Sequence, residues 1–231
     1  MSNDHDSHAV VLPAPGPEFL PHTVAHHFDT SEQEFQAAKL GFWLFLATEI
    51  LLFGGLFAAY FYFHENYPET FKRGGAQLNW ILGALNTTVL LISSWTMAMG
   101  VRSAQTSQKR KMLLYLGLTA LGAVTFLVVK FFEYKAKYDH GLMPGRFFTD
   151  EHGLMGDVPF APQFFSIYFT ATGLHGLHVL VGLCLILWII KGGARGRFHA
   201  NYYLPVDLVG LYWHLVDLIW IFLFPLLYLV P

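Results

Sequence analysis

Residues 42–53 read Phe-Trp-Leu-Phe-Leu-Ala-Thr-Glu-Ile-Leu-Leu-Phe, an apolar run interrupted by a single carboxylate at Glu49. The run belongs to a longer apolar segment, residues 40–63, which is long enough to cross a hydrocarbon core of about 30 Å as an α-helix. Because lipid offers no hydrogen-bond partners, a chain that crosses it must satisfy its own backbone, as a helix does. This stretch therefore predicts a membrane-spanning helix with an acid near its middle.

Four further segments of similar length and hydropathy follow, at residues 78–101, 112–132, 164–190 and 206–230. The composition agrees with them, because 54% of the 231 residues are hydrophobic and only 13% are charged, against about a quarter charged in a soluble domain. The net charge of −2 provides no basic surface for nucleic acid. We predict an all-α, polytopic membrane helical bundle with five transmembrane helices, formed by residues 39–231.

Residues 1–38 contain four prolines but no Lys or Arg, so they resemble neither a secretory signal nor an Arg-rich transit peptide. We predict that they form a poorly ordered polar tail. Eight of the 14 basic residues, including Arg102 and Lys109 to Lys111, fall on the side of the N-terminus. The positive-inside rule then places the N-terminus in the cytoplasm and the C-terminus outside. The loop at residues 135–161 is therefore external, and it is large enough to make a small surface of its own.

Ionisable side chains inside the predicted spans are costly to bury, so each one is a candidate functional residue with a structural alternative. The alternative is an interhelical hydrogen bond that holds the bundle together, or an Asp217 carboxylate that fixes the tautomer of a nearby imidazole. For Glu49 the choice lies between a neutral, hydrogen-bonded acid and a role in proton handling. For Glu133 we expect an interfacial salt bridge or a lipid headgroup contact. The candidates are Glu49, Glu133, His175, His178, His214 and Asp217.

The histidines leave a cofactor hypothesis open, because two imidazoles at one depth on facing helices can ligate a membrane haem. His175 or His178 with His214 satisfies the depth condition, which makes an independent membrane cytochrome b one alternative. The lone Cys184 has no partner in the chain, so intrachain disulfides and Cys-based metal sites are excluded. No phosphate-binding loop, nucleophile elbow or zinc-protease motif is present. Apart from the haem hypothesis, the sequence motifs assign neither a catalytic residue nor a metal ligand to this chain.

Small residues in two spans indicate faces where helix backbones approach closely. They are Gly54-Gly55 and Ala58-Ala59 in the first span, and Gly173, Gly176 and Gly182 in the fourth. We expect these faces to be helix contacts, within the chain or with a partner.

Five stretches, in order across all five spans, form a pattern of motifs. They are Gly41-Phe-Trp-Leu-Phe-Leu-Ala-Thr-Glu49 continuing to Gly55-Leu-Phe-Ala-Ala-Tyr60, Leu85-Asn-Thr-Thr-Val-Leu-Leu91, Phe131-Phe-Glu-Tyr134, Thr172-Gly-Leu-His-Gly-Leu-His-Val179 and Tyr212-Trp-His-Leu-Val-Asp-Leu-Ile-Trp-Ile-Phe-Leu-Phe-Pro225. Together they resemble subunit III of the haem-copper terminal oxidases, and five such motifs in register make a chance match implausible.

The resemblance implies an accessory, cofactor-free subunit of a respiratory oxidase that reduces oxygen to water and pumps protons. It implies haem and copper on partner subunits I and II, bound structural phospholipid, and support of proton uptake and of stability during turnover. The family's intramembrane glutamate falls on Glu49, to which we assign proton-uptake support. Lipid or subunit contact is assigned to Glu133, His175, His178, His214 and Asp217.

Two features set this chain apart from larger family members. Those members have seven spans and this chain lacks the first two, which is a bacterial pattern and implies the bacterial inner membrane. The loop at residues 135–161 is also longer than usual, and our hypothesis is that it makes an extra contact with a cytochrome or a larger respiratory complex. A related accessory protein of nitric oxide reduction shares many of the motifs and remains an alternative function. The choice of cytochrome c or quinol as electron donor resides on other subunits.

Overall fold

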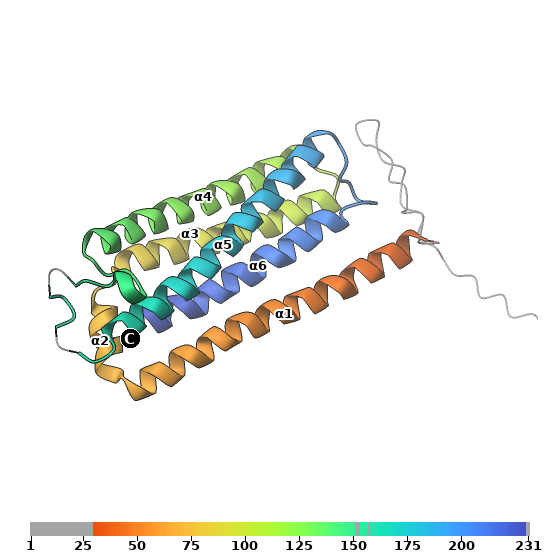
Figure 1. Cartoon of the computed structure of the whole chain (residues 1–231). Coiled ribbons are helices and arrows are strands. Elements are labelled where there is room, and N and C mark those ends of the chain that lie inside the picture. Colours follow the sequence, from red (N-terminus) through yellow and green to blue (C-terminus); the bar gives the residue numbers. More distant parts are fainter. Residues whose placement is uncertain (1–29, 151–152, 157, 230–231) are drawn as a thin grey trace, which may run out of the picture.

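The computed structural model describes residues 30–150, 153–156 and 158–229, and it contains five helices long and apolar enough to cross a membrane. This confirms the predicted all-α fold with five spans. The helices lie side by side as an elongated bundle (Figure 1). They are α1 (Ser31–Asn66), α3 (Trp80–Gln105), α4 (Lys109–Asp139), α5 (Ala161–Ala194) and α6 (Leu204–Phe224).

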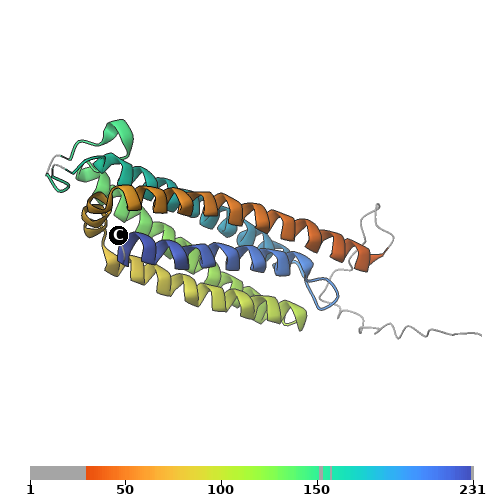
Figure 2. The same cartoon turned by 90° about the horizontal axis from the view of Figure 1, so that it is seen from below.

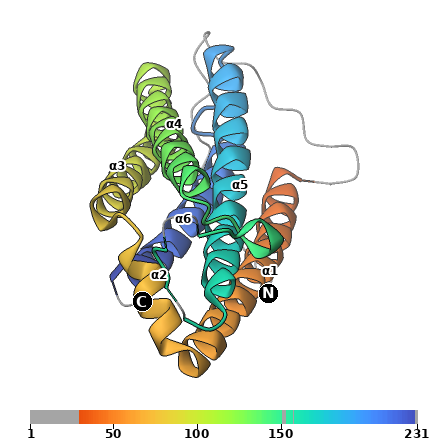
Figure 3. The same cartoon turned by 60° about the vertical axis from the view of Figure 1, so that its left-hand side comes forward.

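The bundle has a packed interior and a more loosely attached edge. Helices α3 and α4 pair at one side, α5 and α6 occupy the middle, and α1 lies at the opposite edge against α5 and α6 (Figures 2 and 3). The interior between α3, α4, α5 and α6 contains fully buried Trp213, Trp220 and Phe126. Most large side chains of α1, such as Trp43 and Leu51, face outward. Outward apolar side chains are expected where lipid is the solvent.

The two ends of the bundle differ in structure. We call the end where α1 begins the N-terminal end, and the end where α6 finishes the C-terminal end. Short elements gather at the C-terminal end, where α2 contacts both α5 and the final segment (Figure 1). They are α2 (Pro68–Ala76), a 3₁₀ turn at Gly145–Phe147 and a π-helical segment at Pro225–Leu229.

Helix α1 begins inside the segment predicted to be a poorly ordered tail. It starts at Ser31, and the Thr30 hydroxyl caps it by accepting a hydrogen bond from the Gln33 amide at 3.1 Å. The expectation was therefore wrong for residues 31–38, whereas residues 1–29 lie outside the described part of the chain. The reason is that hydropathy marks only the apolar part of a helix, whose polar first turn lies beyond it.

The connection after α4 is shorter than predicted, because α4 continues to Asp139 and residues 140–160 alone link it to α5. The sequence did not predict α2, whose nine residues are polar on average and begin with a proline. Side chains of α2 hold the connection in place. Thr70 donates to the Pro159 carbonyl at 2.7 Å, and Arg73 donates to the Met155 carbonyl at 3.1 Å.

Candidate functional site

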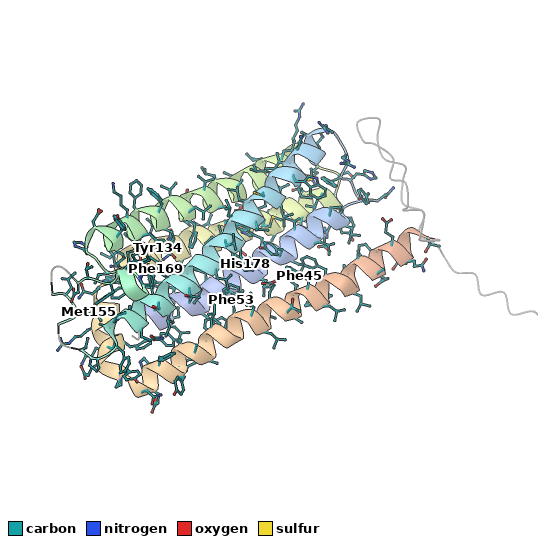
Figure 4. All side chains as sticks on the ribbon, in the orientation of Figure 1. Phe45, Phe53, Tyr134, Met155, Phe169 and His178 are labelled. Atoms are coloured by element: carbon teal, nitrogen blue, oxygen red, sulfur yellow. The ribbon has the colours of Figure 1, made fainter. Side chains whose placement is uncertain are left out.

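Glu49 and His178 form a carboxylate–imidazole pair between α1 and α5. Both residues lie near the middle of their helices, and Glu49 Oε2 is 2.8 Å from His178 Nε2. Each side chain is 14% exposed, so the pair sits at the edge of the bundle and not in its interior. Figure 4 shows His178 on α5 beside Phe53 of α1, whose ring centroid lies 5.2 Å from the imidazole. The structure thus joins two of the predicted candidates.

The second nitrogen of His178 fixes the number of protons in this pair. Nδ1 lies 2.7 Å from the Leu174 carbonyl oxygen, which only accepts hydrogen bonds, so Nδ1 carries a hydrogen. The contact between Nε2 and Glu49 then needs one more proton between its two atoms. That proton gives either an imidazolium with a carboxylate or a neutral imidazole with a carboxylic acid. Both forms have no net charge, and they differ only in which atom carries the proton.

His175 has a different environment from His178, although only three residues separate them. Its side chain is fully buried, stacked on Trp220 at 5.0 Å and against the edge of Phe126 at 5.3 Å. Neither ring nitrogen has a hydrogen-bond partner among the described residues. His175 therefore faces the interior of the bundle, whereas His178 faces α1.

His214 and Asp217 lie on α6 and face the α3 side of the bundle. His214 Nδ1 is 2.7 Å from the Ser94 hydroxyl of α3. Asp217 lies one turn further along α6 and is 3% exposed, and neither of its oxygens has a hydrogen-bond partner in the described part of the chain. No hydrogen bond links it to an imidazole there, so the expected Asp217–imidazole pair does not form. The mid-depth polar groups are separate contacts, not a single belt.

Glu133 lies in a buried hydrogen-bonded cluster that we call the Lys130 cluster, formed by Lys130, Glu133, Tyr168 and Tyr228. Lys130 Nζ is 3.1 Å from Glu133 Oε2 and 2.7 Å from the Tyr228 hydroxyl. The hydroxyls of Tyr168 and Tyr228 donate to Glu133 Oε1 at 2.9 and 2.6 Å. All four side chains are buried, and the ammonium also lies 5.0 Å from the Trp220 ring. The two opposite charges compensate each other, and the two tyrosine hydroxyls supply further hydrogen bonds to the ammonium and carboxylate groups.

Burial corrects the assignment of lipid contact at three positions. The residues Glu133, His175 and Asp217 are at most 4% exposed, because each side chain points between helices of its own chain. Their contacts are therefore internal packing and not lipid. His178 and His214 are only partly buried and still reach the outer surface of the bundle.

Lys130 is not among the candidates predicted from the sequence, although it lies within the predicted span at residues 112–132. A signal for its role was present. A lysine inside an apolar span with a glutamate three residues later places both charges on one helical face, where they can pair.

The three mid-span histidines do not face one another in pairs. His175 packs on aromatic rings, His178 bonds to Glu49, and His214 bonds to Ser94. Among the described residues, no group of three or more His, Cys, Asp or Glu side chains is arranged to hold a metal ion. A bis-histidine haem site needs two imidazoles that face each other, and the way the helices are rotated in this structure does not support it.

The fold and these contacts define a polytopic membrane protein of the helical-bundle class, and comparisons with known proteins identify its family. A family model for cytochrome c oxidase subunit III matches residues 156–230. Cytochrome c oxidase subunit 3 of Thermostichus vulcanus is 34% identical over 195 residues, covering 83% of this chain and 86% of the relative. Subunit 3 of the Pseudomonas aeruginosa cytochrome bo(3) ubiquinol oxidase is 28% identical over 210 residues, covering 90% and 92%. The Loxodonta africana cytochrome c oxidase subunit 3 is 30% identical over 201 residues, covering 84% and 69%.

The chain therefore belongs to the cytochrome c oxidase subunit III family of the haem-copper oxidases. It is a multi-pass membrane protein and a non-catalytic subunit of an oxidoreductase complex in the respiratory chain.

Proposed function

We propose that this chain packs against the catalytic subunit of a haem-copper oxidase and that its Glu49–His178 pair supports proton uptake during oxygen reduction. The observation that carries the proposal is the 2.8 Å contact between Glu49 Oε2 and His178 Nε2, together with the carbonyl oxygen at Nδ1, which requires a proton between the two atoms. The proton can move between these atoms while the pair stays neutral, and its release to a neighbouring group leaves one negative charge on the pair until a proton is taken up again.

The position of the pair supports this role. Glu49 and His178 are partly exposed at the seam between α1 and α5. A group at this edge remains within reach of a neighbouring subunit, whereas a group in the α3–α6 interior does not. Tyr212 donates to the His178 backbone carbonyl at 3.1 Å, which helps to hold the imidazole in place.

The remaining parts of the proposal follow from the family. Subunits I and II are the proposed partners and carry the haem and copper. Phospholipid is the proposed structural ligand on the lipid-facing surface, and contact with lipid or a partner at His178 and His214 stays part of the proposal. We place the complex in the bacterial inner membrane, with the N-terminal end of the bundle cytoplasmic and the C-terminus external.

Oxygen reduction is favoured over nitric oxide reduction, because the relatives named above are all oxidase subunits. We assign donor selection to the partner subunits, since relatives named for cytochrome c and for ubiquinol oxidases both match most of the chain. A subunit list and haem spectrum of the complex purified from native membranes test both statements. Co-purification with a nitric oxide reductase would overturn the first.

The proton role is tested by Glu49→Gln in the intact complex, measured as proton pumping and as activity retained over sustained turnover. Glutamine keeps a hydrogen bond to Nε2 but holds no exchangeable acid proton. We expect an assembled complex that loses activity faster or pumps less than wild type.

The matched control for this test is Thr48→Val, at the same depth on α1. Among the described residues, the Thr48 hydroxyl donates to the Phe45 carbonyl of its own helix and makes no bond to another helix, so this variant should behave as wild type. If Glu49→Gln matches Thr48→Val in pumping and in activity over long assays, the pair is merely a structural hydrogen bond.

A further inference from the structure

A cleft opens between α3 and α6 towards the N-terminal end of the bundle. Its cavity volume is ≈ 280 Å³, enough for several water molecules at about 30 Å³ each. It is separate from the Glu49–His178 seam, since neither residue lines it. Its walls include Ala98, Arg102, Gln105, Asp207, Gly210 and His214.

The outer part of this cleft is polar. Arg102 and Gln105 belong to the last turn of α3, and Arg102 Nη1 lies 3.5 Å from Gln105 Oε1. Asp207 belongs to the first turn of α6 and is 3.6 Å from Lys39 Nζ of α1. Asp207 is paired with Lys39, and Arg102 has only the neutral Gln105 side chain as a hydrogen-bond partner among the described residues, so water would solvate these charges better than an acyl chain would. The mouth of the cleft therefore favours water over lipid tails.

The inner end of the cleft is lined by the His214 imidazole, and the buried Asp217 carboxyl group lies further along the same helix. His214 lines the cleft, and its Nδ1 is occupied by the Ser94 hydroxyl at 2.7 Å. Asp217 follows three residues later on the same helical face, about 4.5 Å further from the mouth. Its carboxyl group is buried beside the Ser94 hydroxyl, and neither oxygen meets the distance and angle of a hydrogen bond with any group in the described part of the chain. An ionised carboxylate there would be uncompensated, whereas a protonated one has no charge to solvate.

We propose that this cleft is a water-filled inlet and that His214 exchanges protons between its water and Asp217, which holds a proton as a neutral acid. Release of a proton by Asp217 leaves a carboxylate, and the proton passes through the neighbouring Ser94 hydroxyl to the His214 imidazole bonded to it, and from there to water. Uptake is the reverse, so no other reactant is needed. The charged and titratable groups along this route are Arg102 on α3, Asp207 and His214 on α6, and Lys39 on α1, with the Ser94 hydroxyl from α3.

Hydration of the cleft is tested by thiol accessibility in the purified complex. In a Cys184→Ser background, Ala98→Cys places a thiol in the cleft, and Leu187→Cys places one on the outward face of α5. Both positions lie seven residues before the end of their helix. A charged, water-soluble thiol reagent should modify the Ala98→Cys protein at least about tenfold faster, because the reactive thiolate forms where water reaches. Equal rates would show that lipid or protein fills the cleft and would overturn the proposal.

Proton exchange at Asp217 is tested by infrared spectroscopy on transfer from H₂O to D₂O. We expect a carbonyl band of a protonated carboxylic acid that shifts on exchange and is absent from Asp217→Asn. His214→Phe should slow the shift by about tenfold or more, because phenylalanine cannot carry a proton. If the band is missing in wild type, or shifts equally fast in His214→Phe, the relay is wrong.

The thiol and infrared measurements do not depend on the proton role proposed for Glu49. Because Glu49 does not line the cleft, Glu49→Gln should leave both the thiol reactivity and the Asp217 exchange unchanged. If Asp217→Asn fails to fold, the thiol measurement still decides whether the cleft holds water.

Discussion

Two regions of the molecule contain an acid–base pair inside the membrane, and they treat it differently. In the α3–α6 interior, Glu133 and Lys130 are buried and bonded to two tyrosine hydroxyls as well as to each other. At the α1 seam, Glu49 and His178 share one contact and remain partly exposed. The interior pair is saturated and fixes the helices around it. The seam pair has a single contact at the edge of the bundle, and the proposed proton role depends on this difference.

Breaking the interior pair should give the largest effect. Lys130→Met removes the cation and leaves the Glu133 carboxylate buried without its counter-charge, a change that typically costs about 3–5 kcal/mol. We expect a matching loss of resistance to unfolding in SDS, and loss of the chain from the purified complex. The control is Lys135→Met on the same helix, where the side chain is exposed.

A double variant sharpens this test of the interior pair. Lys130→Met combined with Glu133→Gln removes both charges, so it should destabilise the protein less than Lys130→Met alone. A double variant as unstable as the sum of its single changes would show that the two charges act independently.

Two glycines show the same difference between the interior and the α1 edge of the bundle, and we expect their substitution to have an effect on stability of intermediate size. A Cβ at Gly182 of α5 would lie 2.8 Å from the Trp213 ring, whereas one at Gly55 of α1 would meet nothing within 4 Å. Gly182→Ala should therefore cost about 1–3 kcal/mol through overpacking. Gly55→Ala should be neutral or slightly stabilising in the isolated chain, since alanine favours helix over glycine. SDS unfolding of both purified variants measures the difference, and equal losses would contradict the loose-edge description of α1.

The sequence predicted the five spans, because twenty apolar residues in lipid have few alternatives to a helix. It did not predict which face of each helix meets which neighbour. His175 and His178 are close in sequence, yet one stacks on Trp220 and the other bonds to Glu49. That outcome depends on how α5 is rotated against α1 and α6, and rotation is set by side-chain packing and not by hydropathy. Likewise the sequence predicted helix contacts within the chain or with a partner at these glycines, without deciding between the two. A Cβ at Gly182 would meet Trp213 of the same chain, whereas Gly54 and Gly55 face outward, where a contact with a partner stays a prediction.

The smallest expected effect on stability is that of Glu49→Gln. The glutamine amide can still donate to His178 Nε2, so an exchange of one hydrogen bond for another should change the free energy of unfolding by about 1 kcal/mol or less. Glu49→Ala leaves Nε2 without its partner and should cost about 1–3 kcal/mol. If Glu49→Gln changes proton pumping without changing SDS unfolding, the seam pair acts through its proton and not through its bond. If both variants unfold alike, as early as Lys130→Met, the seam is as structural as the interior and the contrast between the regions is lost.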